Sequence, residues 1–369
     1  MKVAIVHDFL NQYGGAERVV EAIKMIYPEA PIYTSFFEPE KLPERMRSWQ
    51  VITPNFKKIP LIRRFSKQYT FLLPLAFESF DLRDYDVIIS STANFAKGII
   101  TKPNQIHICY CHTPPRFLYH YETEFNRRKI SIYKPFLIFL DHYLRVWDYL
   151  AAQRVDYFLT NSYNTQQRIK KFYRRESKVI YPPVELSSTG QNSQYKTQNY
   201  GKYFFIVSRL VAYKRIDLAI KACNELNLNL VVAGTGKDKK KLEKLSGKTI
   251  KLLGKVSDIE LAGLYKNCEG FIFPAGDDFG MTPVEAMLYG KPVIAYGKGG
   301  VLESVIPGKT GEFFYENNVV SLKKVLANFN GNNYLKENCQ KQAQKFSKSK
   351  FSKELRNFVT EKWKEEQNA

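Results

Sequence analysis

The sequence predicts an α/β protein of two Rossmann-like domains, each built on a doubly wound parallel sheet. Short runs of β-branched and aliphatic residues recur along the chain, and each is followed by a turn and then by residues with helical periodicity. This order is typical of parallel strands joined by crossover helices. The length of 369 residues also exceeds what one hydrophobic core usually supports, so two domains are expected.

The first half contains four such runs, and each is expected to be a buried strand because parallel sheets are covered on both faces. They are Val3–Val6, Val87–Ile89, Ile106–Cys109 and Tyr157–Thr160. Residues 136–152 have helical periodicity instead, and their apolar face is formed by Leu140, Leu144, Trp147 and Ala151. That face is expected to pack on the core of the first domain.

A polar segment marks the domain boundary. Residues 186–202 are rich in Ser, Gln, Asn and Gly and contain almost no aliphatic side chain, which predicts a linker or an exposed loop. We therefore expect a first domain over 1–187, a linker over 188–202 and a second domain over 203–345. The tail, 346–369, is polar and helical, and packing back on the first domain is one option for it.

The alternation restarts after the linker and predicts a second doubly wound sheet. Its expected strands are Phe204–Val207, Leu228–Val232, Ile250–Leu253, Gly270–Phe273 and Pro292–Ala295.

The charge of the chain points to anionic partners. Lys and Arg number 56 against 36 Asp and Glu, which gives a net charge of +20. Nucleic acid, an anionic membrane surface and a diphosphate substrate all fit this charge, and the charge does not choose among them. The five cysteines have no CxxC spacing, so neither a disulfide framework nor a zinc site is expected, and a reducing compartment suits them.

The start of the chain, MKVAIVHDFL, lacks the long apolar region of a signal peptide. The longest apolar stretch, residues 133–140, is far too short to span a bilayer. We therefore expect a cytoplasmic protein that does not cross the membrane.

Two glycines follow the first predicted strand. Gly14 and Gly15 open a helix, where free backbone amides accept an anion and the lack of a side chain lets a ligand approach. The pattern is not GxGxxG, and a simple turn is the alternative interpretation.

In the second half, Arg209 and Lys214 follow the restart strand, near the carboxyl edge of the sheet, where ligands of open α/β sheets bind. A guanidinium and an ammonium that converge on one diphosphate stabilise the charge of a departing nucleoside diphosphate, which other enzymes achieve with a divalent metal. The alternative is a pair of solvated surface cations.

The segment 273–287 supplies a context for these cations. Asp277 and Asp278 lie beside a glycine turn and a helix that opens near Thr282, so carboxylates stand next to free backbone amides. Carboxylates bind sugar hydroxyls and amides bind phosphates, so the segment is suited to both halves of a sugar phosphate. The turn at 296–300, YGKGG, is expected to be a loop after a strand, with helix capping as the alternative.

Several motifs taken together resemble the retaining glycosyltransferases of family 4, which have the GT-B fold. In the second half they are SRLVAYKRIDLAI, VVAGTG, LGKVSDIEL and PAGDDFGMTPVEAMLYGKPVIAYGKGGVLESV, and in the first half HDFLNQYGGAER and CHTPPRFLYH. They cover nearly the whole chain in the expected order. The resemblance implies two Rossmann-like domains that face each other across a cleft.

The resemblance also implies roles for particular residues. Arg209 and Lys214 match the pair that holds the donor diphosphate, and Glu285 matches the carboxylate that binds the ribose hydroxyls. Asp277 occupies the first acidic position, where the family usually has Glu. Because Asp is one methylene shorter, either the backbone lies closer to the sugar or Asp278 shares the contact.

Backbone groups complete the implied donor site. The amides of Phe279, Gly280, Met281 and Thr282 are expected to meet the donor sugar and phosphate, and the turn of Gly254 and Val256 to lie by the base.

In the first half, His112 matches a histidine that orients the donor sugar, and Gly14 and Gly15 match the loop beside the diphosphate. In the mechanism inferred for such enzymes the acceptor attacks from the leaving-group face and a phosphate oxygen takes its proton. The resemblance therefore implies neither a metal nor any other cofactor, only a nucleotide-sugar co-substrate.

Two further patterns are interpreted as unrelated to function. Asp84-Tyr85-Asp86 spells the DxD of metal-dependent glycosyltransferases, but it precedes a strand in a GT-B pattern. The lysines of 237–241, with Lys244 and Lys248, resemble a nucleic-acid patch, but aromatic residues do not interleave with them, so a solvated face is expected and no nucleic-acid partner.

The acceptor is inferred from two basic segments, Phe56–Tyr69 and Phe125–Ile130, which mix cations with apolar and aromatic residues. Such segments rest on anionic bilayers, and ordinary helices with basic outer faces are the alternative. A glycan or a lipid-diphosphate-linked acceptor at the inner face of the cytoplasmic membrane is expected.

Within the family, the motifs look most like bacterial mannosyltransferases of surface-polysaccharide assembly, which use GDP-mannose. UDP-hexose donors are the alternative within the class. A catalytically inactive sugar-nucleotide or polyanion-binding protein and a nucleic-acid binder are the alternatives outside it.

Overall fold

The computed structural model describes residues 1–54, 71–119, 134–185 and 200–368. The chain forms two compact units, the first made of Met1–Pro183 and Lys348–Ala369 and the second of Val184–Ser347. The predicted basic segments 56–69 and 125–130, and most of the predicted linker 188–202, lie outside the described residues.

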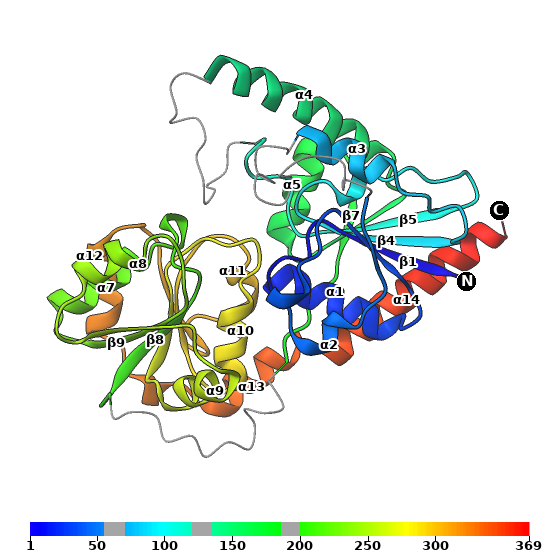
Figure 1. The fold of residues 1–369 in the computed structure, drawn as a ribbon. Helices are drawn as coiled ribbons and strands as arrows, with labels where there is room; N and C mark the ends of the chain where they lie inside the picture. The colour runs from blue at the N-terminus through cyan, green and yellow to red at the C-terminus, as the bar shows by residue number, and fades with distance from the viewer. Residues whose placement is uncertain (55–70, 120–133, 186–199, 369) are drawn as a thin grey trace. The chain divides into compact units, whose positions relative to one another are not determined.

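The first unit contains a seven-stranded sheet of order β3-β2-β1-β4-β5-β6-β7, in which all neighbours pair in parallel (Figure 1). The four strands expected from the sequence are confirmed, and β2, β3 and β7 are additional. The strands are β1 (Val3–His7), β2 (Ile32–Thr34), β3 (Val51–Ile52), β4 (Val87–Thr92), β5 (Ile106–Cys111), β6 (Tyr157–Thr160) and β7 (Ser177–Val179).

Helices cover both faces of this sheet. Figure 1 shows α1 and α14 side by side on one face, with α3, α4 and α5 on the other. The helical elements are α1 (Gly15–Ile26), η1 (Pro39–Lys41), α2 (Glu44–Arg47), α3 (Leu73–Glu78), η4 (Ala96–Gly98), α4 (Lys134–Gln153), α5 (Tyr163–Tyr173) and α14 (Lys348–Gln367). The last helix of the chain therefore belongs to the core of the first unit.

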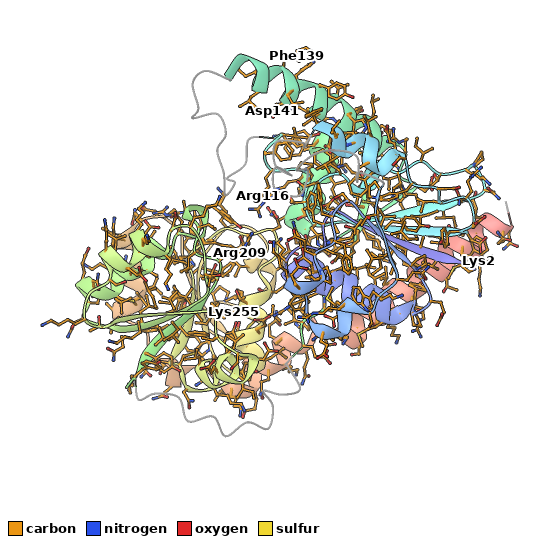
Figure 2. The ribbon with its side chains drawn as sticks, viewed as in Figure 1. Lys2, Arg116, Phe139, Asp141, Arg209 and Lys255 are labelled. Atoms are coloured by element: carbon orange, nitrogen blue, oxygen red, sulfur yellow. The ribbon has the colours of Figure 1, made fainter. Side chains whose placement is uncertain are left out.

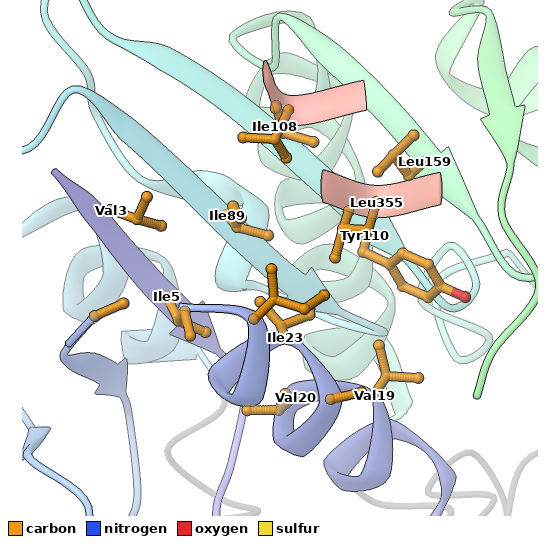
Figure 3. Close-up of a cluster of buried hydrophobic side chains, with 14 of the residues drawn as sticks. Val3, Ile5, Val19, Val20, Ile23, Ile89, Ile108, Tyr110, Leu159 and Leu355 are labelled. Carbon is orange, nitrogen blue, oxygen red and sulfur yellow. The ribbon is translucent and has the colours of Figure 1, made fainter. Parts of the chain in front are cut away.

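The side chains of each strand alternate between two hydrophobic layers, as the pleat requires. Ile5, Ile89 and Ile108 meet Ile23 of α1 and Leu355 of α14 in one layer (Figure 3). The residues between them on the strands, such as Ala4 and Ile88, enter the opposite layer. This burial on both faces explains why the central strands have continuous aliphatic sequences.

The predicted core-facing stripe of α4 is confirmed. Leu144, Trp147 and Ala151 are buried, and Leu140 packs partly buried against the same cluster. Trp147 also donates a hydrogen bond from Nε1 to Glu78 Oε1 of α3, at 2.8 Å. A Cβ on Gly98 would lie 2.3 Å from the Trp147 ring, so this position requires glycine for close packing.

A buried ion pair joins η4 to α4. Lys97 and Asp148 are 1% and 0% exposed and are in direct contact. Asn94 O accepts a second hydrogen bond from Lys97 Nζ at 2.6 Å, and Tyr119 Oη donates to Asp148 Oδ2 at 3.0 Å. Because both charges have left water, each depends on the other for compensation.

The second unit contains a six-stranded, fully parallel sheet of order β10-β9-β8-β11-β12-β13. The five expected strands are confirmed, and β13 is additional. The strands are β8 (Tyr203–Val207), β9 (Asn229–Ala233), β10 (Ile250–Gly254), β11 (Gly270–Phe273), β12 (Val293–Tyr296) and β13 (Gly311–Phe314).

This sheet also has a core on each face. Ile206, Val232 and Ile272 pack with α7 and α12, whereas Phe205 and Phe271 pack against Tyr265 of α9. The helical elements are η7 (Ala212–Lys214), α7 (Ile216–Glu225), α8 (Lys239–Leu245), α9 (Asp258–Asn267), α10 (Met281–Leu288), α11 (Val301–Ser304), α12 (Val319–Ala327), η8 (Gly331–Asn333) and α13 (Lys336–Gln344).

Among the described helices, none combines the length and the apolar character that a membrane span needs.

Removing Asp148 tests the buried ion pair. We expect Asp148→Ala to lower the free energy of unfolding of the first unit by about 3–5 kcal/mol, because the Lys97 ammonium is left buried without compensation. Urea titration followed by tryptophan fluorescence measures this selectively, since Trp49, Trp147 and Trp363 all belong to the first unit. The double variant Lys97→Met/Asp148→Leu should recover most of the loss, and a double variant as unstable as the single one would contradict the charge argument.

Candidate functional site

The strand order of the second unit defines where a ligand is expected. The chain winds outward from β8 to β9 and β10 on one side and from β11 to β12 and β13 on the other. The order reverses between β8 and β11, and open α/β sheets bind ligands outside the carboxyl ends of their strands at such a point. The loops after β8 and β11 carry the predicted cations and carboxylates.

Lys214 and Asp277 meet at this edge. Lys214 ends η7 after β8, Asp277 follows β11, and the two form an ion pair in which each side chain is 15% exposed. The Lys214 ammonium also lies 5.3 Å from the ring centre of Tyr213 and 5.9 Å from that of Phe273. The sequence predicted both residues for one site, and the structure brings them into contact.

Arg209 lies in the same loop but has a different principal contact. It is exposed, and its Nη2 donates a hydrogen bond to Tyr213 Oη at 2.6 Å. Figure 2 labels Arg209 on the loop after β8. Tyr213 therefore contacts both predicted diphosphate ligands, Arg209 through its hydroxyl and Lys214 through its ring, and sequence reasoning did not assign it a role.

The acidic loop leads directly into α10. Gly280 precedes the helix with a φ of 85°, a left-handed conformation that favours glycine. Met281 and Thr282 form the first turn of α10, where backbone amides have no partner within the helix. Asp278 and Phe279 are buried, so the loop is fixed between the sheet and the helix.

The second glycine loop, between β12 and α11, supports the acidic loop from behind. A Cβ on Gly299 would lie 2.2 Å from Asp277 O, and one on Gly300 would lie 2.2 Å from Asp278 O. The Gly300 amide donates a hydrogen bond to Asp277 O at 3.0 Å. The YGKGG segment is therefore a loop after a strand, as expected, and its glycines allow direct backbone contact with the acidic pair.

Glu285 is buried on α10. Its Oε2 accepts a hydrogen bond from Tyr265 Oη of α9 at 2.9 Å, and the Tyr265 ring stacks on Tyr289 at 5.3 Å. These contacts fix the carboxylate. Tyr265 is a further residue that sequence reasoning missed, because only the fold brings α9 to α10.

Gly254 and Val256 lie at the same edge but further along it. Gly254 ends β10 with a φ of 77°, and its carbonyl accepts a hydrogen bond from the Gly234 amide at 2.6 Å. Because β10 is two strands from β8 in the sheet, Gly254 and Val256 follow a different strand of the edge from Arg209 and Lys214.

A hollow of about 820 Å³ occupies another part of the second unit. Its lining includes Lys202, Glu269 and Lys291, which precede β8, β11 and β12. These positions mark the amino ends of the strands. Since ligands bind at the carboxyl ends of such sheets, we assign the candidate site to the edge with Lys214 and Asp277.

In the first unit, His112 follows β5 and is firmly held. Its Nε2 lies within hydrogen-bonding distance, 2.8 Å, of Ser91 Oγ, and its carbonyl accepts hydrogen bonds from Asn161 Nδ2 at 2.9 Å and Thr165 Oγ1 at 3.3 Å. The side chain is buried, with 8% exposure for the residue. The end of β4 therefore holds the ring, and residues after β6 and in the first turn of α5 hold the backbone of His112.

The glycine loop of the first unit is tied to the same strand end. The Gly14 amide donates to Glu17 Oε2 at 2.8 Å, and Glu17 Oε1 lies 3.8 Å from His7 Nε2. His7 Nδ1 donates to Ser91 O at 2.9 Å. Since Nδ1 carries a hydrogen and Nε2 faces a carboxylate, the imidazolium form of His7 fits this geometry. Ser91 thus links the His112 ring to the Gly14 loop through His7 and Glu17.

The pKa values of this pair move in opposite directions. Burial alone lowers the pKa of His7, but the Glu17 carboxylate, together with Asp8 and the Ser91 carbonyl, outweighs burial, so that the pKa lies above 6.5. Burial alone raises the pKa of Glu17, but His7 and hydrogen bonds from backbone amides outweigh burial, so that the pKa lies below 4.5. Both shifts favour the charged pair over the neutral one.

Asp8, the neighbour of His7, organises the loop after β4. Its carboxylate accepts hydrogen bonds from the amides of Ala93, Asn94, Phe95 and Ala96 at 2.7–2.9 Å, and from Thr92 Oγ1. These are the free amides that lead into η4. The position of Asp8 two residues after the predicted strand Val3–Val6 was the available sequence signal, but its partners lie more than 80 residues away.

Asp86, the last residue of the DxD sequence, has a structural role. Asp86 Oδ2 accepts a hydrogen bond from the Lys2 amide at 2.6 Å and lies 3.6 Å from the amino terminus.

Comparison with known families identifies the class. Residues 13–188 match the model described as Glycosyltransferase Family 4, and residues 190–346 match Glycosyl transferases group 1. The chain is therefore a glycosyltransferase with the GT-B fold. It combines a family 4 domain with a group 1 domain, and the predicted fold is confirmed.

Individual relatives are similar at modest identity. The uncharacterized glycosyltransferase MJ1178 of Methanocaldococcus jannaschii is 36% identical over 207 residues, which are 55% of this chain and 57% of that protein. The Alpha-1,3/1,6-mannosyltransferase ALG2 of Debaryomyces hansenii is 27% identical, with 83% of this chain and 76% of that protein covered. The human ALG2 is 25% identical, with 79% and 75% covered.

Solved structures of the same fold are also found. Anabaena Alr3699/HepE in complex with UDP-glucose superposes with a TM-score of 0.71 at 18% identity, over 98% of this chain and 100% of that one. Sucrose-phosphate synthase from Thermosynechococcus elongatus gives a TM-score of 0.72 at 14% identity, over 97% and 98%. At these identities the likeness concerns the fold alone.

Stability against pH tests the His7–Glu17 pair. A raised His7 pKa contributes stability that is complete below pH 6.5 and is lost as pH rises through the folded value. A lowered Glu17 pKa contributes stability that is complete above pH 4.5 and is lost as pH falls. We expect Glu17→Gln to lower the free energy of unfolding by about 1–3 kcal/mol between pH 4.5 and pH 6.5. At higher pH the variant and the wild type should differ less.

Urea titrations at several pH values, read by tryptophan fluorescence, measure this difference. Glu21→Gln is the matched control, because Glu21 lies one turn further along α1 and pairs with Arg45, which stays charged. Its cost should not shrink between pH 6.5 and 8. A Glu17→Gln cost that is equally constant would refute the imidazolium assignment.

Two glycine substitutions test the support of the acidic loop. Gly299 and Gly308 both have a left-handed φ, 85° and 69°, but only Gly299 has an atom within 4 Å of an added Cβ. We expect Gly308→Ala to cost about 1 kcal/mol from backbone strain, and Gly299→Ala about 1–3 kcal/mol more from the clash with Asp277 O. Differential scanning calorimetry compares the two variants, and equal costs would show that the contact is easily relieved.

Proposed function

We propose that this glycosyltransferase transfers mannose from GDP-mannose to a glycan or lipid-diphosphate-linked acceptor with retention of anomeric configuration. The observation that carries the proposal is the contact of Lys214 with Asp277 at the switch point of the second sheet. A cation for the diphosphate and a carboxylate for the sugar hydroxyls thus stand side by side.

The surrounding residues fit the two halves of such a donor. In the proposal, Lys214 and Arg209 take the diphosphate together with the first amides of α10. Glu285, fixed by Tyr265, takes the ribose hydroxyls. Carboxylate and ammonium ligands of this kind give charge-assisted hydrogen bonds, which are stronger than neutral ones.

The transfer step needs no side-chain nucleophile in this scheme. The bond between the sugar C1 and the diphosphate oxygen breaks, and the acceptor oxygen forms its bond to C1 on the same face. The acceptor proton passes to a phosphate oxygen of the departing nucleoside diphosphate. Lys214 and Arg209 stabilise the charge that develops on that group, which is the contribution a divalent metal makes elsewhere.

His112 belongs to the same proposal as the residue that orients the sugar. Its ring is held by Ser91, so it is a positioned polar group and not a mobile base. His112→Ala removes this orienting group, so turnover should fall.

The donor identity is supported by relatives that are mannosyltransferases by name. The ALG2 proteins match most of this chain at 24–27% identity. The alternative donor is a UDP-hexose, since Alr3699/HepE holds UDP-glucose on the same fold. A role in surface-polysaccharide synthesis and an acceptor at an anionic membrane surface complete the proposal, in keeping with the net charge of +20.

Metal-free donor turnover tests the function. Nucleoside diphosphate release is followed from a panel of GDP- and UDP-sugars with EDTA present, in the presence of membrane lipid extract as a source of acceptor. We expect release from GDP-mannose, and a loss of roughly 100-fold or more in Lys214→Ala. Lys323→Ala is the matched control, because Lys323 forms a surface ion pair with Glu225 away from the candidate site.

Each outcome separates one part of the proposal. Release from UDP-sugars alone would overturn the mannose assignment and retain the site. Activity that EDTA abolishes would overturn the metal-free mechanism. Silence across the panel, with sugar nucleotides still bound, would assign the chain a binding role in place of transfer.

A further inference from the structure

Helix α4 has a second apolar face that is open. Between Leu137 and Gln153, the exposed positions carry no charged side chain other than the titratable His142. The large exposed apolar residues and their exposed fractions are Ile138 (55%), Phe139 (71%), Tyr143 (50%), Val146 (47%), Tyr149 (40%) and Leu150 (53%). Contiguous apolar surface of this kind on a soluble domain marks an interaction site.

The spacing shows that this is one continuous stripe. Phe139, Tyr143, Val146 and Leu150 recur at intervals of four, three and four residues, which places them on one side of a helix. The core-facing stripe that contains Leu144 and Trp147 is a separate set, already buried against α3 and η4. A surface helix needs only one apolar face, so packing among the described residues of the first unit does not explain the second.

The neighbouring helix α3 also carries exposed apolar side chains. Leu75 on α3 is 59% exposed and Phe71, just before α3, is 42% exposed. α3 and α4 are joined by the hydrogen bond from Trp147 to Glu78, and Figure 1 shows them together on the same side of the sheet. Figure 2 shows Phe139 near the outer end of α4, directed away from the sheet.

Cations stand at the end of this surface. Gln153, the last residue of α4, donates to Tyr173 O at the end of α5. Lys170, Lys171 and Arg174 are exposed there, and the nearby acids are Asp156 and Glu176, of which Glu176 pairs with Lys170. The apolar stripe is therefore adjoined by positive charge where α4 ends.

We propose that α4 lies on an anionic phospholipid bilayer, with Phe139, Tyr143, Val146 and Leu150 entering the interface and the adjoining cations meeting the lipid phosphates. Aromatic and aliphatic side chains with flanking Lys and Arg are the composition of interfacial helices. Tyrosine suits this depth because its hydroxyl stays hydrated while its ring is buried. A second copy of the chain is a less suitable occupant, because two chains of +20 repel each other.

Binding of α4 to a bilayer would hold the chain at the membrane surface where the proposed acceptor lies, and only the nature of that acceptor rests on the proposed function. Lipid binding through α4 needs neither donor nor acceptor, so it is measured separately from transfer. It also names a surface different from the basic segments that the sequence suggested.

Vesicle sedimentation of the full chain tests the proposal. The probe is phosphatidylcholine vesicles with about 30% phosphatidylglycerol, without sugar nucleotide. We expect the triple variant Phe139→Gln/Val146→Gln/Leu150→Gln to partition roughly 100-fold more weakly than wild type. Vesicles of phosphatidylcholine alone should bind wild type more weakly, because the cations then lack a partner.

The matched control replaces equally exposed apolar residues elsewhere. Met25, Val320 and Leu335 are 59%, 75% and 63% exposed, on α1, on α12 and just before α13. The variant Met25→Gln/Val320→Gln/Leu335→Gln should bind vesicles like wild type. Both triple variants should keep the wild-type melting temperature, because every replaced side chain is largely solvated.

Three results would overturn the proposal. One is a wild-type chain that does not sediment with anionic vesicles, and another is an α4 variant that sediments as wild type does. The third is a stable dimer in analytical ultracentrifugation that only the α4 variant dissociates, which would make the stripe a self-interface. Vesicle binding with no donor turnover would instead overturn the proposed transfer reaction and leave the α4 surface established.

Discussion

Because every strand pair in both sheets is parallel, the carboxyl ends of the strands in each sheet share one edge. Residues far apart in sequence are thereby brought together without any local motif, as Lys214 after β8 and Asp277 after β11 demonstrate. The same geometry in the first unit gathers His7, Ser91 and His112 from the ends of β1, β4 and β5. The candidate chemistry depends on this pairing more than on any single side chain.

Buried charges then fix the loops at those edges. Asp8 binds four consecutive amides after β4, and the Lys97–Asp148 pair connects the following turn to α4. A buried charge without its hydrogen-bond partners raises the free energy of the folded state. Buried charges therefore favour the one loop conformation that supplies all the partners over others that bury the same apolar area. In the second unit the support is different, because Gly299 and Gly300 let one backbone lie directly on another.

Much of the fold could be predicted from the sequence because the central strands are continuous aliphatic runs. The missed strands are of another kind: β3 has two residues, β7 alternates with polar residues, and β2 and β13 lie beside aromatic and polar neighbours. The acidic loop and the cations could be predicted as members of a site from their motifs. The roles of Tyr265 and Glu17 could not, because each depends on a partner from another strand or helix that only the tertiary structure brings close.

The contact between Lys214 and Asp277 has a consequence for the order of events during turnover. Lys214 and Asp277 are ion-paired in the structure, so on the proposed assignment a diphosphate that binds Lys214 competes with Asp277 for it. A complete donor compensates at once, since its sugar hydroxyls occupy the released carboxylate. A nucleoside diphosphate without the sugar offers no hydroxyl groups to Asp277. The Asp277 carboxylate then competes with the diphosphate for Lys214, and the original ion pair re-forms. On the proposed assignment, the ion pair therefore favours entry of the intact donor and departure of the spent one.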